Sequence, residues 1–285
     1  MIEPVMKQVM GSGVAIQLAG WGEQGKPVLC VHGLTANCRC WDGIAEALSA
    51  KHHILAMDLR GRGRSERPVS GYDIGHHCLD IEALLHDLGL HSAVLMGHSL
   101  GAFITLAFAA HYPQSVERII LVDGGGQLSP EQFAKVIGGV KPAIERLGKV
   151  FPSLEAYCAN LKQAPFLQPW SPALETYLRY EVEEVPAGIR SRVQPSAIEE
   201  ELRNLRQFNV AELYPLVRCP VLILRAENGT LAEDDILLPD EVLERMLREI
   251  PDARCVNVKD TNHYTIMFQP HAVRDQAIIE FLEEG

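Results

Sequence analysis

The sequence predicts an α/β protein built around one mostly parallel sheet with helices on both faces. Short apolar runs alternate along the chain with longer segments of helical character, which gives strand–helix–strand units. The runs are apolar at almost every position, as in PVLCVHG at 27–33. Continuous apolar runs of this kind are typical of strands that are covered on both faces.

The predicted elements follow one another in a regular order. An opening hairpin at about 5–10 and 13–19 turns at Gly11-Ser12-Gly13. The apolar runs predict buried strands at 27–33, 53–58, 92–97, 116–122, 220–226 and 253–258. The segments between and after them predict helices at about 40–50, 74–88, 100–111, 240–249 and 270–283.

The alternation stops between residues 125 and 214. Helical segments in this part of the chain are separated by eight prolines, and no buried strand is evident: Pro130, Pro142, Pro152, Pro165, Pro169, Pro172, Pro186 and Pro195. Because the strand–helix rhythm resumes afterwards, we expect one core domain at 1–124 and 215–285. The segment 125–214 is predicted to be a helical insertion into it.

Length and charge limit the possible functions. A chain of 285 residues can bury one large core, and 47% hydrophobic with 22% charged residues is ordinary for a globular enzyme. The net charge of −11 argues against nucleic acid or an anionic membrane as a partner. No stretch approaches the roughly 20 apolar residues of a membrane span. The sequence makes no prediction of the oligomeric state.

The N-terminus and the cysteines favour a cytoplasmic location. MIEPVMKQVMGSGVAI carries an early acid and lacks the basic region and long apolar segment of a secretory signal. Seven cysteines without a regular framework are typical of reduced thiols. Cys38 and Cys40 have no second Cys or His pair at zinc-ligand spacing, so no metal site is expected.

The strongest functional signal is MGHSLGA at 96–102. Ser99 lies between an apolar strand and a helix, with Gly97 and Gly101 two positions on either side. A sharp strand-to-helix turn pushes a serine clear of the sheet edge, and glycines at these positions relieve the crowding. The turn also aims the amide of Leu100 at the same place, at the positive end of the helix. The segment therefore predicts a nucleophilic serine.

Two other segments supply partners for such a serine. His263, in KDTNHYTI after the last predicted strand, is the best general base of the eleven histidines, because a loop there can swing over the sheet edge. The strand that ends in His-Gly at 32–33 allows a turn after which the amide of Leu34 can face that of Leu100. Two such donors would hold the oxyanion of a tetrahedral intermediate. His98 is expected to point away from the serine and to serve as a packing partner.

Together these segments resemble the α/β-hydrolase fold family along nearly the whole chain. The matching features are VHGLT at 31–35, DLRGRGRS at 58–65, GHSLGA at 97–102 and TNHYTI at 261–266. The resemblance implies a Ser-His-acid hydrolase without a cofactor, with the insertion as its cap. It also implies that Arg60 has a structural role. A serine at position 99 weighs against dehalogenase and epoxide hydrolase activity, which would require aspartate there.

The acid of the triad has more than one candidate. Many relatives carry it after the strand equivalent to 220–226, but here that strand runs into RAENGTLAEDD, and Gly229 stands near the expected position. Three acids are available in this loop: Glu227, Asp234 and Asp235. The family can also keep its acid one strand earlier, where LVDGGG places Asp123 at a strand end, 24 residues after Ser99. We expect Asp123 to orient the histidine, with Asp235 or Asp234 as the alternative.

The expected substrate is a small acyl compound, apolar or carrying a carboxylate. The insertion offers aromatic side chains for an apolar pocket: Phe151, Tyr157, Phe166, Trp170, Tyr177 and Tyr180. It also offers arginines that could bind a carboxylate, although solvated, paired side chains are the simpler interpretation: Arg179, Arg190, Arg192, Arg203 and Arg206. The favoured function is ester hydrolysis through an acyl-enzyme. The alternatives are cleavage of an amide or a carbon–carbon bond on the same triad and, less favoured, a non-catalytic receptor.

Overall fold

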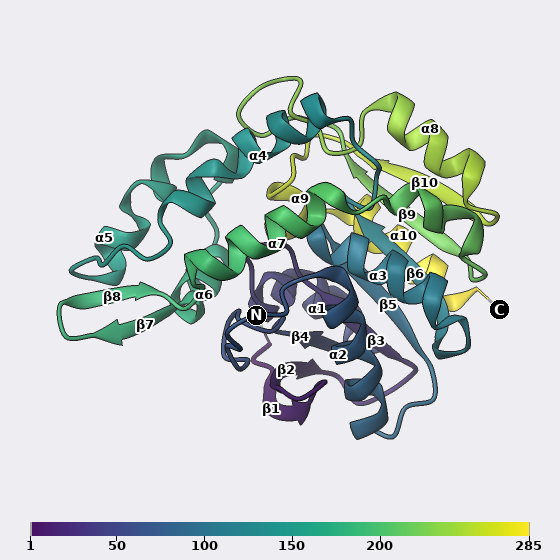
Figure 1. Cartoon of the computed structure of the whole chain (residues 1–285), viewed down its shortest axis with the longest axis horizontal. Coiled ribbons are helices and arrows are strands. Elements are labelled where there is room, and N and C mark those ends of the chain that lie inside the picture. The colour runs from purple at the N-terminus through teal and green to yellow at the C-terminus, as the bar shows by residue number, and fades with distance from the viewer. Residues whose placement is uncertain (1, 285) are drawn as a thin grey trace.

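The computed structural model describes residues 2–284 and contains an eight-stranded sheet, shown in Figure 1. Its strands are β1 Val5–Met10, β2 Ala15–Trp21, β3 Pro27–Val31, β4 His53–Met57, β5 Ala93–His98, β6 Val116–Val122, β9 Val221–Ala226 and β10 Ala253–Val258. Their order is β1-β2-β4-β3-β5-β6-β9-β10. The pairs β1–β2 and β2–β4 are antiparallel, and all other neighbours are parallel. The predicted α/β class with a mostly parallel sheet is confirmed.

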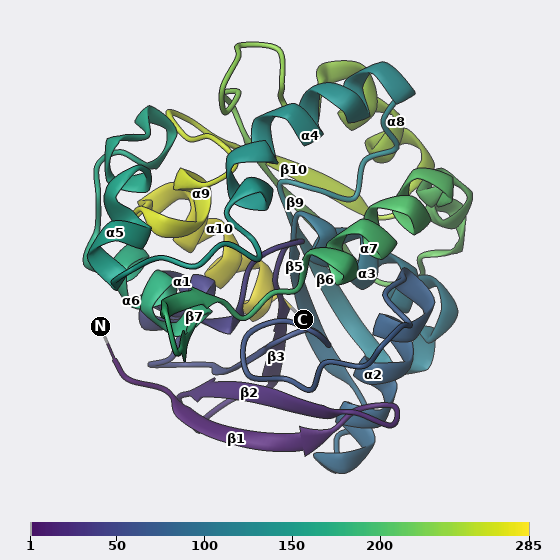
Figure 2. The same cartoon turned by 60° about the vertical axis from the view of Figure 1, so that its left-hand side comes forward.

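Helices cover both faces of the sheet (Figure 2). One face carries α2 Ile74–Asp87, α3 Leu100–His111 and α8 Asp240–Glu249, and the other carries α1 Asp42–Leu48 and α10 Ala272–Glu283. The side chains of strand β5 show why the apolar runs in the sequence are continuous. Leu95 packs in the cluster that includes α3, whereas Val94 and Met96 pack in the cluster that includes α1 and α10. Each successive side chain therefore enters a different half of the core.

The strand order creates a crevice at the carboxyl ends of β3 and β5. The chain runs from β3 to its neighbour β4, and then returns to β5 on the other side of β3. The short helix η1 (Cys38–Trp41) and α1, which follow β3, pack on one face, and α3, which follows β5, packs on the opposite face. Loops that diverge in this way leave an opening, which is where open α/β sheets bind ligands.

The segment between β6 and β9 is mostly helical but is not purely so. Its helices are α4 Pro130–Glu145, α5 Leu154–Ala159, α6 Pro172–Glu181 and α7 Pro195–Gln207, with short turns η3 Leu161–Gln163, η4 Pro165–Leu167 and η5 Val210–Leu216. The insertion also contains two strands that the sequence did not indicate, because β7 Val182–Val185 and β8 Gly188–Ser191 form an antiparallel hairpin in which only Ser191 is buried. Charged side chains hold this hairpin: Glu183 pairs with Arg67 of the core and with Arg190. The boundaries at 124 and 215 stay a prediction.

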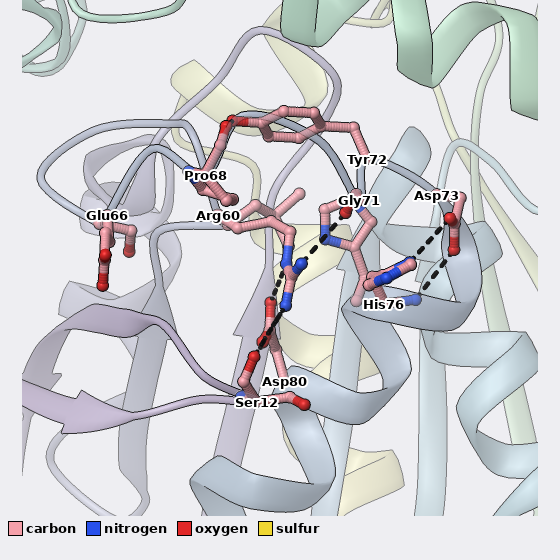
Figure 3. Close-up of polar contacts among 12 residues, drawn as sticks. Ser12, Arg60, Glu66, Pro68, Gly71, Tyr72, Asp73, His76 and Asp80 are labelled. Carbon is pink, nitrogen blue, oxygen red and sulfur yellow. Dashed lines mark hydrogen bonds and ion pairs between the residues drawn. The ribbon is translucent and has the colours of Figure 1, made fainter.

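Arg60 ties three parts of the core together. Its Nε and Nη2 atoms each donate to a carboxylate oxygen of Asp80 in α2 over 2.7 Å (Figure 3). The same guanidinium donates to the carbonyl oxygens of Gly71 and of Ser12, in the β1–β2 turn. A bidentate, buried arginine pair of this kind fixes geometry. The structural role inferred for Arg60 agrees with these contacts.

The fold has no helix, among residues 2–284, that is long and apolar enough to cross a membrane. All seven cysteines carry unpaired thiols.

Candidate active site

Ser99 occupies a strained turn between β5 and α3. Its backbone has φ 56° and ψ −120°, a conformation that L-residues rarely adopt. The flanking glycines are needed for steric reasons. A Cβ atom on Gly97 would lie 2.2 Å from the carbonyl oxygen of Gly101, and one on Gly101 would lie 2.0 Å from that of Val31. The strand and helix can approach this closely only without those side chains, and the approach leaves Ser99 at the crevice.

His263 and Asp123 form a buried pair beside this turn. His263, in the loop between β10 and the short helix α9 (Thr265–Phe268), lies with Nδ1 2.8 Å from Oδ2 of Asp123. The other carboxylate oxygen accepts the amide of Ala226 over 3.1 Å. The hydrogen bond to Nδ1 leaves Nε2 as the free nitrogen of the ring. Within residues 2–284 the Ser99 hydroxyl makes no hydrogen bond, but Ser99 and His263 line one cavity.

The alternative acids lie away from His263. Asp235 is buried, and its carboxylate accepts the backbone amides of three residues of its own loop: Thr230, Leu231 and Ala232. Asp234 is exposed and pairs with Lys135 of α4 over 2.5 Å. Glu227 is also exposed. Of the four candidate carboxylates, the one in contact with the histidine is Asp123.

Leu34 and Leu100 lie beside Ser99 and line a cavity together with it. Leu100 opens α3, and the loop of Leu34 comes so close that a Cβ on Gly33 would lie 3.0 Å from the Ser99 Cβ. Neither amide donates a hydrogen bond to another group in the described part of the chain. Among residues 2–284, both N–H groups therefore remain free to donate a hydrogen bond.

Arg62 holds the loop of Leu34, and sequence reasoning missed it. Its Nε donates to the Leu34 carbonyl oxygen over 3.1 Å, and its Nη2 pairs over 2.9 Å with Glu201 of α7. Glu201 also contacts the buried His77 ring over 2.8 Å. Although burial opposes it, the charges of His77 and Arg62 lower the pKa of Glu201 to about 2. The motif at 58–65 was the available signal for Arg62, but its partner lies 139 residues later in the chain.

His98 packs as expected, but against the predicted base. Its ring stacks on that of His263 with centroids 4.5 Å apart, and its Nε2 donates to the His263 carbonyl oxygen over 3.1 Å. It also lines the cavity of Ser99, which the sequence did not indicate. Burial, reinforced by the neighbouring His263, lowers the pKa of His98 well below its usual value. His98 therefore stays neutral near pH 7 and adds no positive charge next to His263.

Two cavities meet at Ser99. The first, which we call the aromatic chamber, has a volume of about 50 Å³ and is lined by residues that include Tyr177, His263, Tyr264, Met267 and Phe268. The second, the apolar chamber, has a volume of about 60 Å³. Its lining consists of Ser99, two glycines and these side chains: Leu34, Leu100, Phe103, Leu128, Phe133, Val136, Ile137, Val140, Leu202, Leu205 and Leu237. Among the residues that the structure describes, Ser99 therefore supplies the sole polar side chain of the apolar chamber.

The arginines predicted from the insertion do not reach either chamber. Arg179 pairs with Glu175, whereas Arg190 and Arg192 pair with Glu183. Of the predicted aromatic residues, Tyr177 lines the aromatic chamber, and Phe166 lines a smaller cavity that continues it.

Arg146, at the end of α4, also lines this continuation and was not predicted. Two of its nitrogens lie within 3.2 Å of Glu181, and its Nε also donates to the hydroxyl of Tyr157 over 2.8 Å. Its charge is therefore already matched by a carboxylate.

The comparison with known families decides the classification. Residues 26–270 match the model of the alpha/beta hydrolase fold family. The chain belongs to this family. It is 29% identical to a 2-(acetamidomethylene)succinate hydrolase of Mesorhizobium japonicum, over 91% of this chain and 88% of the relative. It is 26% identical to an N-formylmaleamate deformylase of Pseudomonas putida, over 90% and 88% of the two chains.

One solved structure is similar to nearly the whole length of this chain. The crystal structure of an E-2-(acetamidomethylene)succinate hydrolase superposes with a TM-score of 0.85 at 25% identity, covering 99% of this chain and all of the other. The match includes the insertion as well as the sheet, because so little of either chain lies outside it. The protein therefore has the α/β-hydrolase fold and belongs to the α/β-hydrolase family.

Proposed function

We propose that the protein hydrolyses uncharged carboxylic esters through a triad of Ser99, His263 and Asp123. The observation that carries the proposal is the 2.8 Å contact of the His263 ring with Asp123, next to a serine on a strained turn. A serine is a weak nucleophile until a positioned base removes its proton, and a base needs a partner that fixes its tautomer. The proposal requires no metal or cofactor.

The proposed reaction proceeds in two halves. His263 Nε2 accepts the Ser99 hydroxyl proton while Oγ bonds to the ester carbonyl carbon, and the amides of Leu34 and Leu100 stabilise the oxyanion. The bond to the alcohol oxygen breaks, and this oxygen takes the proton from His263. Water then attacks the acyl-enzyme, giving one proton to His263, and Ser99 recovers it as the acid leaves. Asp123 stabilises the imidazolium in both halves.

The surroundings of Ser99 favour an uncharged substrate. The linings of both chambers contain no arginine, lysine, aspartate or glutamate among the described residues. A carboxylate placed there would be buried without a partner, which costs several kcal/mol. This supports the apolar member of the two substrate types expected from the sequence.

Amide hydrolysis is the second candidate, and the relatives favour it. The names of the Mesorhizobium japonicum hydrolase and the Pseudomonas putida deformylase specify an acetamido compound and a formyl group. The same triad chemistry cleaves an amide if His263 protonates the leaving nitrogen. Ester and amide substrates of equal acyl group distinguish the two candidates by their relative kcat/KM.

The direct test is hydrolysis of p-nitrophenyl butyrate by the wild-type protein and by Ser99→Ala. We expect kcat to fall at least about 10⁴-fold, because the nucleophile is lost. The melting temperature should stay within a few degrees, because alanine keeps the same Cβ. Turnover by Ser99→Ala at the wild-type rate would contradict the proposed mechanism.

A further inference from the structure

We propose that the acyl group of the substrate lies in the apolar chamber and extends from Ser99 to solvent between α4 and α7, while the leaving group occupies the aromatic chamber. The inference rests on the proposed function, and it adds the substrate class: an ester of a medium or long apolar acid with a compact alcohol. Three observations carry it, namely the position of His263, the continuity of two cavities, and the distribution of charge.

The position of His263 separates the two sides of the reacting carbon. The leaving oxygen must come within hydrogen-bond distance of the general acid, so the leaving group lies on the side of His263. His263 lines the aromatic chamber and does not line the apolar chamber. The apolar chamber instead contains Ser99 with the two residues that carry the oxyanion donors, Leu34 and Leu100. The remaining substituent of the carbonyl carbon, the acyl chain, is thus directed into the apolar chamber.

The apolar chamber continues outwards into a larger groove. This outer groove has a volume of about 390 Å³ and shares five lining residues with the chamber: Phe103, Gly126, Leu128, Phe133 and Leu205. It is lined from one side by α4, through Phe133 and Ala134, and from the other by α7, through Leu205 and Arg206. Figures 1 and 2 show these two helices side by side. A chain longer than the chamber therefore has a path to the surface along mostly apolar side chains, with Gln127 and Arg206 as the polar residues of the groove lining in the described part of the chain.

The leaving-group side has much less room and no free charge. The aromatic chamber and its continuation have volumes of about 50 and 40 Å³ and share Thr35, Tyr177, Tyr264 and Phe268. Within residues 2–284, Arg146 is the one cation that lines this continuation, and Glu181 binds it at 2.8 and 2.9 Å. No described residue of this lining offers an unpaired cation to a charged leaving group, so a compact and neutral alcohol fits best.

The test uses p-nitrophenyl esters from acetate to octanoate with Ala134→Trp and a matched control. Ala134 is exposed on α4 and lines the outer groove but not the inner chamber, so a tryptophan there narrows the path without touching the core. Lys141→Trp adds the same side chain to an exposed position of α4 that lines none of these cavities. Ala134→Phe repeats the test with a smaller ring, and Ser99→Ala measures the background.

For the wild type, kcat/KM should rise up to about three- to fourfold per added methylene until the groove is filled. Ala134→Trp should lower kcat/KM for octanoate about tenfold or more and leave acetate within about twofold. Lys141→Trp should have the same kcat/KM as the wild type for both the acetate and the octanoate ester. Serine-dependent hydrolysis with no rise along the series, or equal effects of the two tryptophans, would overturn the acyl assignment and leave the proposed function standing. Absence of serine-dependent turnover on every ester would contradict the proposed function itself, and with it the assignment.

Discussion

Asp123 and Asp235 are two buried aspartates that follow neighbouring strands, and they differ in what they accept. Asp123, just after β6, is 1% exposed and accepts hydrogen bonds from the His263 ring and one backbone amide. Asp235, in the loop after β9, is 4% exposed and accepts three amides of its own loop. Burial alone does not distinguish them. The identity of the donors does, because a carboxylate bound by amides shapes a loop, whereas one bound by imidazole can orient a base.

Of the substitutions in this comparison, Asp123→Asn is expected to lower kcat/KM the most. The asparagine can keep its oxygen towards the Ala226 amide and then presents an NH₂ group to Nδ1 of His263. The ring would have to accept there and carry its proton on Nε2, where it can no longer take the proton of Ser99. We expect kcat/KM for p-nitrophenyl butyrate to fall about 10⁴-fold at an almost unchanged melting temperature.

Asp235→Asn should have the opposite effects: it should lower the stability of the protein and leave its activity almost unchanged. Its three amide donors would meet one oxygen and one NH₂ group, so at least one buried amide loses its acceptor. This costs about 1–3 kcal/mol of unfolding free energy and lowers the melting temperature by several degrees. We expect kcat/KM to stay within about threefold of the wild type. If Asp235→Asn lost more activity than Asp123→Asn, the acid would have to be assigned to the loop after β9.

The smallest effect should come from Asp234→Asn, which is the matched neighbour of Asp235. Its carboxylate is exposed and contacts Lys135, and an exposed pair of this kind contributes little to stability. We expect the melting temperature to stay within about 1 °C and kcat/KM to be unchanged. A large loss of activity here would show that this surface loop takes part in the reaction.

The strands of the sheet could be predicted from the sequence because each buried strand is recognisable from the apolar residues of its own segment. Leu95 and its neighbours form an unbroken apolar run, which follows from packing on both faces. The hairpin of β7 and β8 lacked such evidence, since its strands are short and Glu183 also pairs with Arg67, which lies 116 residues earlier in the chain. Local pattern cannot reveal an element that long-range ion pairs stabilise.

The residues of the candidate site could be proposed from the sequence only where they lie in one short motif or at a strand end. Ser99, with its two glycines, lies within one short motif, and His263 follows a strand end. The choice among the acids depended on where the His263 loop lies after folding, which neither LVDGGG nor RAENGTLAEDD encodes by itself. The chambers were not predictable, because they form between side chains of α4, α7 and the loops of the sheet. Of the arginines expected near the substrate, Arg179, Arg190 and Arg192 pair with glutamates away from both chambers, whereas Arg206 lines the outer groove.

The most direct test of the central claim is reaction with a fluorophosphonate, followed by mass spectrometry of the peptides. This reagent is attacked by an activated serine, which replaces fluoride at phosphorus and stays covalently bound. We predict modification at Ser99 in the wild type, and a rate at least about 10²-fold lower in His263→Ala, because the base is lost. An unmodified Ser99 in folded protein, or an equal rate in His263→Ala, would contradict the assignment of Ser99, His263 and Asp123 as a catalytic triad.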